Sequence, residues 1–227
     1  MSNSAFSAFE QSMHSKYAFT IKYKNKSLFM KLLGLLLFFN KGFMTRYITT
    51  IGSTIYFPSE EFVKSKDQSA ISVLAHELIH IQQAKAYGTI LFSLLYLFPQ
   101  CLALLAFLAP ISLWFLLFLL CLAPLPAPWR MKFEVGGYTM SLYMLNTQLK
   151  FFQNPQDKIY EILHSEADRI SRNYFVGPAY WFMWPFGVSA KLRNNIEDIR
   201  DGVIGGKDEI YGCVRQSYLN AVSSTSQ

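Results

Sequence analysis

The stretch of chain between Lys85 and Arg130 contains no charged side chain, and this feature constrains the fold more than any other. Soluble domains rarely leave so much apolar surface without a partner. Because a proline removes a backbone donor and clashes with the preceding helical turn, the prolines in this stretch exclude one straight helix. They are Pro99, Pro110, Pro124, Pro126 and Pro128. We therefore predict two apolar arms, at 89–109 and 111–123, within an inserted hairpin at 89–128.

The lengths of the two arms limit how this hairpin can meet a bilayer. A helical span needs about 20 apolar residues, so the first arm is long enough and the second is short. The sequence is equally compatible with a re-entrant or in-plane hairpin and with two full spans. The alternative without a membrane is a buried hairpin or an oligomer interface. The basic flanks Lys85, Arg130 and Lys132 predict that both ends lie on one side of the membrane, the cytoplasmic side.

The composition favours a membrane-associated protein over a nucleic-acid-binding one. Of the 227 residues, 52% are hydrophobic and 16% are charged, whereas about a quarter are charged in typical domains. The net charge of +6 suits an anionic membrane face, and no basic arm with interleaved aromatic residues indicates nucleic acid. Three cysteines lack the spacing of a disulfide framework, and residues 1–15 lack the apolar core of a signal peptide. We expect one domain over 1–227.

Patterns outside the hairpin predict an α-rich α+β domain with one short sheet. β-branched and aromatic residues predict a strand at 17–23 and, around Gly52-Ser53, a bent strand or hairpin at 46–57. Helical periodicity and capping residues predict helices at 28–39 (interfacial or core), 70–87 (capped by Asp67 or Ser69 and ended by Gly88), 132–149, 156–174 and 190–199. The aromatic cluster at 180–186 is expected to be a packed lid or part of the core, or else a membrane-interface patch. Residues 215–227 are expected to form a disordered tail.

The run His76-Glu77-Leu78-Ile79-His80 carries the strongest chemical signal in the chain. Residues four apart lie on one face of a helix, so His76 and His80 can bind the same metal ion. In this HExxH arrangement the two histidines bind zinc, and the glutamate is the general base on the zinc-bound water. The neighbouring residues are apolar. Polar groups that converge on one face of a buried helix are costly unless they have a partner, and a metal ion would be such a partner. The alternative is a pair of hydrogen-bonded core histidines.

A catalytic zinc needs a third protein ligand and an open coordination position. The longer motif that adds a glycine and a third histidine is absent, because Gln83 and Ala86 occupy those positions. Glu134 is the favoured third ligand, since it lies on the predicted helix after the hairpin, where Gly136-Gly137 permits close approach of another helix.

Other residues compete for roles around this site. His164 is the rival ligand, and it can instead stabilise a tetrahedral oxyanion or lie on a solvated helix face. Tyr138, one turn after Glu134, is a candidate outer-shell or oxyanion partner. Cys101 and Cys121 are soft enough to bind zinc, but their place in the apolar hairpin predicts core or lipid-facing positions.

These residues resemble the zincin metallopeptidases, specifically the gluzincin branch, in which a glutamate is the third zinc ligand. The likeness covers residues 45–145 and rests on strands, the run from Val73 to Gln83 and a later helix with Glu134. The run HELIHIQQ and, less specifically, Trp184-Pro185-Phe186 are similar to small peptidases encoded by bacteriophages. The resemblance implies a zincin-like catalytic domain in which His76, His80 and Glu134 bind zinc and Glu77 is the base. Gln82 departs from the usual hydrophobic residue, and the hairpin lengthens the gap before Glu134.

We therefore predict Zn²⁺-dependent peptide-bond hydrolysis at or in a membrane, with Glu77 as the base and His76, His80 and Glu134 as ligands. Expected partners are a peptide or protein substrate, which can lie along the strand at 51–57, and membrane lipid. Nucleic acid is not an expected partner. One alternative is a membrane-inserting or virion structural protein with a non-catalytic zinc, assembled into a larger complex. Another is hydrolysis of a cell-wall peptide or amide. Specificity depends on pocket shape, which the sequence does not determine.

Overall fold

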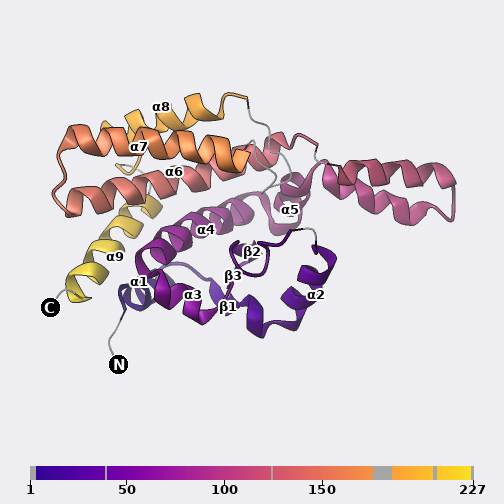
Figure 1. Ribbon diagram of the computed structural model, residues 1–227, viewed down its shortest axis with the longest axis horizontal. Coiled ribbons are helices and arrows are strands. Elements are labelled where there is room, and N and C mark those ends of the chain that lie inside the picture. Colours follow the sequence, from indigo (N-terminus) through magenta and orange to yellow (C-terminus); the bar gives the residue numbers. More distant parts are fainter. Residues whose placement is uncertain (1–3, 39, 124, 176–185, 207–208, 226–227) are drawn as a thin grey trace.

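Two long helices, α4 (Asp67–Tyr87) and α6 (Pro128–Phe151), pack against each other at the centre of the body (Figure 1). The computed structural model describes residues 4–38, 40–123, 125–175, 186–206 and 209–225. Helix α4 buries residues at helical spacing, including Ile71, Leu74 and Leu78, as expected for a helix with a wide apolar face. Within the described residues the α-rich α+β prediction is confirmed.

The start of α4 differs from the prediction. The helix begins at Asp67, three residues earlier than expected, and its N-cap residue is Lys66, without a side-chain capping bond. Asp67 does not cap α4, because its Oδ1 accepts a hydrogen bond of 3.1 Å from the backbone N–H of Phe6. The helix ends as predicted at Gly88, whose φ of +80° is a conformation that glycine adopts without steric cost.

A three-stranded mixed sheet lies beside α4 and consists of β1 (Thr20–Tyr23), β2 (Thr49–Ile51) and β3 (Thr54–Phe57). Of the two forms predicted at 46–57, a bent strand or a hairpin, the structure has the hairpin: β2 and β3 are antiparallel, and Gly52 turns with a φ of +60°. Strand β1 adds to β3 in parallel, with Thr20 opposite Thr54. Alternate residues of β3, Ile55 and Phe57, are buried, so one face of the sheet joins the core.

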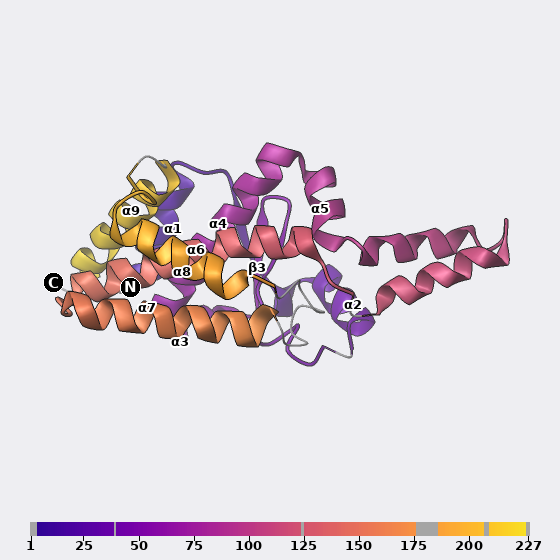
Figure 2. The ribbon, with the colours of Figure 1, turned by 90° about the horizontal axis from the view of Figure 1, so that it is seen from above.

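Helices cover the other sides of the body (Figure 2). Short elements η1 (Lys24–Lys26), α2 (Leu28–Leu36) and α3 (Glu60–Ser65) flank the sheet. Helix α7 (Gln156–Ile170), the following π-helical turn η4 (Ser171–Phe175) and α8 (Val188–Arg200) pack together, and α7 and α8 both contact α6. Of the aromatic cluster predicted at 180–186, residues 180–185 lie outside the described residues, and Phe186 is exposed.

The expectation of a disordered tail at 215–227 is wrong for most of that segment. Helix α9 (Glu209–Thr225) packs against α1 (Ala5–His14). The side chains of Val214, Tyr218 and Val222 are buried in this contact region, and they repeat at helical spacing. Small polar residues surround them in the sequence, so the apolar stripe is narrow and easily overlooked.

The apolar stretch forms the predicted hairpin, which projects from one end of the body (Figure 1). The first arm is not one helix: α5 (Thr89–Leu97) and the 3-10 helix η2 (Gln100–Leu108) meet at an angle of 97° beside Pro99. The 3-10 helix η3 (Leu113–Leu122) returns against η2. In the described residues no single helix is long and apolar enough to cross a membrane, whereas α5 and η2 together meet that test as a bent pair.

Candidate metal centre

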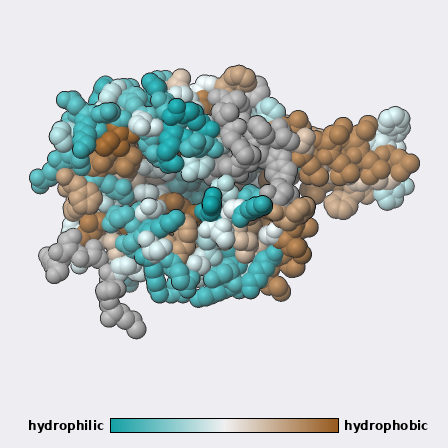
Figure 3. All heavy atoms as spheres, viewed as in Figure 1, coloured by the Kyte–Doolittle hydropathy of each residue, from teal (hydrophilic) through white to brown (hydrophobic). Residues whose placement is uncertain are grey.

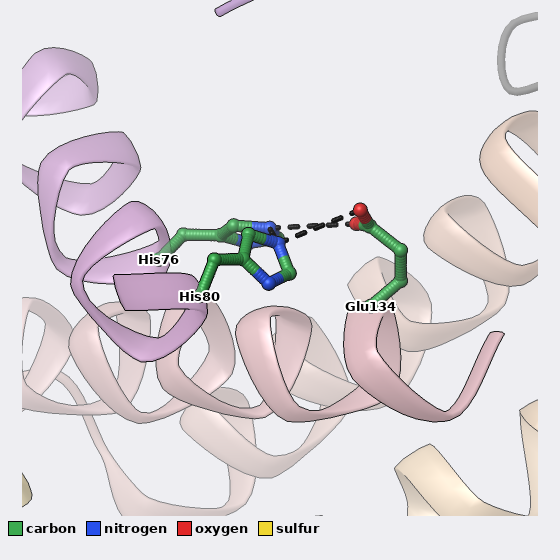
Figure 4. A group of neighbouring side chains, drawn as sticks. All are labelled: His76, His80 and Glu134. Atoms are coloured by element: carbon green, nitrogen blue, oxygen red, sulfur yellow. Dashed lines mark hydrogen bonds and ion pairs between the residues drawn. The ribbon is translucent and has the colours of Figure 1, made fainter. Parts of the chain in front are cut away.

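Three side chains from α4 and α6 converge to form a candidate metal site (Figure 4). The two histidine Nε2 atoms lie 3.1 Å apart. Glu134 approaches both, with Oε2 3.5 Å from His76 Nε2 and Oε1 3.4 Å from His80 Nε2. A tetrahedral zinc with ligands at about 2.0–2.1 Å requires ligand atoms about 3.3 Å apart. The observed separations match that requirement.

The two histidines are oriented by bonds at their other ring nitrogens. His76 Nδ1 lies 3.2 Å from Ser141 Oγ on α6, and His80 Nδ1 lies 2.9 Å from Gln83 Oε1, one turn along α4. Gln83 in turn donates to the carbonyl oxygen of Phe133 at 3.2 Å. Partners at Nδ1 set the ring orientation and leave Nε2 to face a metal, as is usual for metal-binding histidines.

Glu134 fits a cation-binding role because one of its oxygens has no donor. Its Oε1 accepts a hydrogen bond of 2.5 Å from the hydroxyl of Tyr96, but its buried Oε2 has no hydrogen-bond partner among the described residues. A buried carboxylate oxygen without a donor is costly, and a metal ion in the site would satisfy it. The donor set of two imidazoles and one carboxylate suits zinc and other borderline metals, which leaves the identity of the metal to measurement.

The charges of the site interact strongly. Burial lowers the pKa of His80, but the charge and hydrogen bond of Glu134, the charge of Glu77 and the bond to Gln83 together outweigh burial and raise this pKa to about 9. Burial raises the pKa of Glu134, but His80 and His76 outweigh it, so the pKa lies well below its usual range. A metal must therefore displace a proton from His80, and binding is expected to be weaker at low pH.

Glycine on α6 allows the two helices to approach closely enough for the site to form. A Cβ added at Gly137 would lie 2.5 Å from His76 Nε2, closer than real Cβ contacts. At Gly136 the nearest atom to an added Cβ would be Gln83 Nε2 at 2.8 Å. Both glycines therefore allow the close approach of α6 to α4, as the sequence predicts.

Glu77 lies next to the cluster and is not one of its three converging groups. Its side chain is half-buried, and its Oε2 accepts a hydrogen bond of 2.6 Å from the hydroxyl of Thr50 on β2. The sheet thus holds the carboxylate of the predicted base, which stands one residue from a histidine that faces the site.

Tyr138 lies beside the metal centre, whereas His164 lies outside it. Tyr138 packs the edge of its ring against His76, with centroids 4.8 Å apart, so it supports the ring by contact. His164 is not part of the cluster: it lies on α7, 3.7 Å from Glu197 Oε1, and beside the ring of Tyr160. Cys101 and Cys121 are in the hairpin arms η2 and η3, as predicted.

Sequence reasoning missed Tyr96, Thr50 and Ser141. Tyr96 is one of the few hydrogen-bonding side chains in an apolar arm, with Ser93 and Gln100, and such residues in an apolar segment can indicate a buried polar contact. Thr50 and Ser141 carry no such signal, because only the packing of β2 and α6 against α4 brings them to Glu77 and His76.

Comparisons of the chain with protein-family models, with curated proteins and with solved structures found no match. The class of protein therefore rests on fold and site: an α-rich α+β protein with a buried His-His-Glu candidate metal centre and a projecting apolar hairpin.

Proposed function

We propose that the protein is a zinc-dependent peptidase that acts at a membrane surface. The observation that carries the proposal is the spacing of the ligand atoms of His76, His80 and Glu134, together with a Glu134 Oε2 that has no hydrogen-bond partner among the described residues. The HExxH spacing and the resemblance to gluzincins agree with it. Bound zinc would supply Lewis acidity to a water molecule and to the scissile carbonyl.

The residues of the chain have distinct roles in this proposal. His76, His80 and Glu134 hold the ion, and Ser141 and Gln83 orient the two rings. The Glu77 carboxylate accepts the proton of the attacking water and passes it to the leaving amine. The Thr50 hydroxyl fixes one oxygen of Glu77 and leaves the other to take that proton. The strand predicted at 51–57 to bind substrate is largely β3, which lies between β1 and β2 and is not an edge. The edge strand β2, which carries Thr50, is instead the element beside which an extended peptide would lie.

The contact between the hairpin and the site supports a membrane-proximal location. Tyr96, which donates to Glu134, belongs to α5, the first segment of the apolar hairpin. Arg130, at the start of α6, donates to the carbonyl oxygen of Tyr96 at 2.9 Å and to Gln100 Oε1 at 2.9 Å. The metal centre therefore lies at the root of the hairpin, and insertion of the hairpin would hold it close to the headgroups.

Replacing Glu77 with glutamine tests the catalytic role. This variant should bind zinc like the wild type but lose peptide cleavage, because the amide cannot accept the proton. The matched control is Glu61→Gln, which neutralises an exposed glutamate on α3 and should leave both properties unchanged. Zinc content by elemental analysis and cleavage of a denatured-protein mixture are the two measurements. Peptidase activity retained by the zinc-loaded Glu77→Gln variant would refute the proposal.

A structural zinc is the second candidate function, and the burial of the site favours it. His76, His80 and Glu134 are only 7%, 6% and 2% exposed. In that case the protein is a membrane or virion component in which the ion joins α4 to α6. Chelation would then lower the melting temperature, while neither soluble peptides nor membrane-protein substrates would be cut by the metal-loaded protein.

A further inference from the structure

Helix α2 (Leu28–Leu36) turns its apolar face outward. Leu28, Leu32 and Leu35 are 73%, 55% and 72% exposed, and Phe29 and Leu36 lie on the same face. Met30, on the opposite side, is fully buried and attaches the helix to the body. A surface helix of a globular protein usually presents polar residues outward, so the polarity of α2 is inverted.

The chain around α2 is basic without compensating acids. No aspartate or glutamate occurs from Gln11 to Ser59, whereas this segment contains seven basic residues. They are Lys16, Lys22, Lys24, Lys26, Lys31, Lys41 and Arg46. Lys24 is buried and Lys26 pairs with Glu60 at 3.0 Å, but Lys22, Lys31, Lys41 and Arg46 are exposed. An exposed apolar helix face that carries Lys31, in a segment with more exposed cations and no acids, matches an anionic lipid surface.

Helix α2 is held in place before it meets any partner. The side chain of Ser27 caps its start by accepting a hydrogen bond from the N–H of Met30 at 3.3 Å. The buried Lys24 Nζ donates to the carbonyl oxygen of Phe43 at 2.7 Å, which ties the segment after α2 to the turn before it. The apolar face is therefore preorganised rather than formed on binding.

Figures 1 and 2 agree that α2 lies at the end of the body from which the hairpin projects. Figure 3 shows a hydrophobic patch at this place, below the hydrophobic hairpin. The 3-10 helices η2 and η3 have 9 and 10 residues, so at about 2 Å per residue they reach about 20 Å, less than the hydrocarbon core of about 30 Å. A hairpin of that depth does not cross the core, and its insertion brings its root, with α2, to the headgroup region.

We propose that α2 is a second membrane contact, which lies in the plane of an anionic leaflet while the hairpin inserts beside it. The inference rests on the membrane location in the proposed function and is independent of the chemistry at the metal centre. A bilayer fits better than a protein partner because the exposed cations of this acid-free segment, Lys31 on α2 among them, are complementary to lipid phosphates. Two attachments would also prevent rotation of the body about the hairpin and so fix the orientation of the metal centre.

Quenching of tryptophan fluorescence by brominated lipids tests this contact in the full-length protein. Leu32→Trp places the probe on the apolar face of α2, and Leu35→Trp is a second variant on the same face. The matched control is Val203→Trp, at a 63% exposed position in the segment that joins α8 to α9. This segment lies away from the end of the body that carries α2 and the hairpin (Figure 1). The wild-type emission of its 4 tryptophans is subtracted, and circular dichroism checks that each variant is folded.

With phosphatidylcholine–phosphatidylglycerol vesicles brominated in the acyl chains, the emission added at positions 32 and 35 should be mostly lost, and that at 203 should persist. Vesicles without phosphatidylglycerol should give weaker quenching. Emission at 32 and 35 that persists as at 203, or quenching that is equal in both lipid mixtures, would overturn the proposal. Quenching of the wild type, which has Trp114 in η3, reports hairpin insertion separately. A wild type that is not quenched would refute the membrane location itself, whereas the Glu77→Gln assay tests catalysis alone.

Discussion

Replacing Gly137 with alanine isolates the helix approach on which the candidate metal centre depends. The new Cβ would lie 2.5 Å from Nε2 and 2.7 Å from Cε1 of His76, whereas ordinary contacts begin at 3.4 Å. The ring must therefore retreat by about 0.9 Å, which exceeds the tolerance of about 0.2 Å on metal–ligand distances. His76 would then no longer be able to bind the same ion as His80 and Glu134.

Two effects of opposite sign act on stability, whereas metal binding can only weaken. Alanine in place of glycine within a helix adds about 1 kcal/mol of stability, and overpacking removes about 1–3 kcal/mol. Changes to groups that merely orient a ligand weaken metal binding about 10–100-fold. Displacing the His76 ring itself should cost at least about 100-fold, which corresponds to about 2.7 kcal/mol.

Two other glycines provide a graded control. Gly212 on α9 has no atom within 4 Å of an added Cβ, so Gly212→Ala should gain up to about 1 kcal/mol of stability without changing zinc affinity. Gly136→Ala displaces only the flexible end of Gln83 and should weaken zinc binding about tenfold. Competition with a chromophoric chelator measures the affinities, and urea unfolding measures the stabilities. Zinc affinity of Gly137→Ala equal to that of Gly212→Ala would refute the proposed ligand set.

Three further predictions follow from individual contacts. Tyr96→Phe removes the hydroxyl that donates to Glu134 and should weaken zinc binding about 10–100-fold in the same competition assay; unchanged affinity would mean that this hydrogen bond does not orient the ligand. Burial lowers the pKa of Lys24 to about 7, although the Glu77 carboxylate partly offsets this shift. Above that pH the unfolded chain therefore binds more protons than the folded protein. The free energy of unfolding should therefore rise from pH of about 7 to about 10, by at most about 1.4 kcal/mol per pH unit, and Lys24→Met should lack this rise in urea titrations. Ending the chain at Val214 should lower the free energy of unfolding by about 3 kcal/mol or more, because it removes buried residues such as Tyr218; a stability equal to that of the full chain would restore the prediction of a disordered tail.

The sequence determined those features of the protein that depend on local geometry. The spacing of His76 and His80 places both rings on one face of any helix, and the turn of β2 and β3 at Gly52 follows from local backbone preference. The uncharged stretch with its prolines determined a hairpin. In each of these cases the interacting residues are neighbours in the chain, so their pattern needs no knowledge of the rest of the fold.

Only the tertiary structure decided between Glu134 and His164 as the third member of the cluster. Both lie on predicted helices far from His80 in the chain, and the packing of α6 against α4 brings only Glu134 to it. The packing of α5 against α6 places the Tyr96 hydroxyl on Glu134, and the packing of α1 against α4 makes Asp67 a partner of Phe6 instead of a helix cap. The physical reason is that these contacts depend on how amphipathic helices dock, and many docking arrangements bury similar apolar area from the same local patterns.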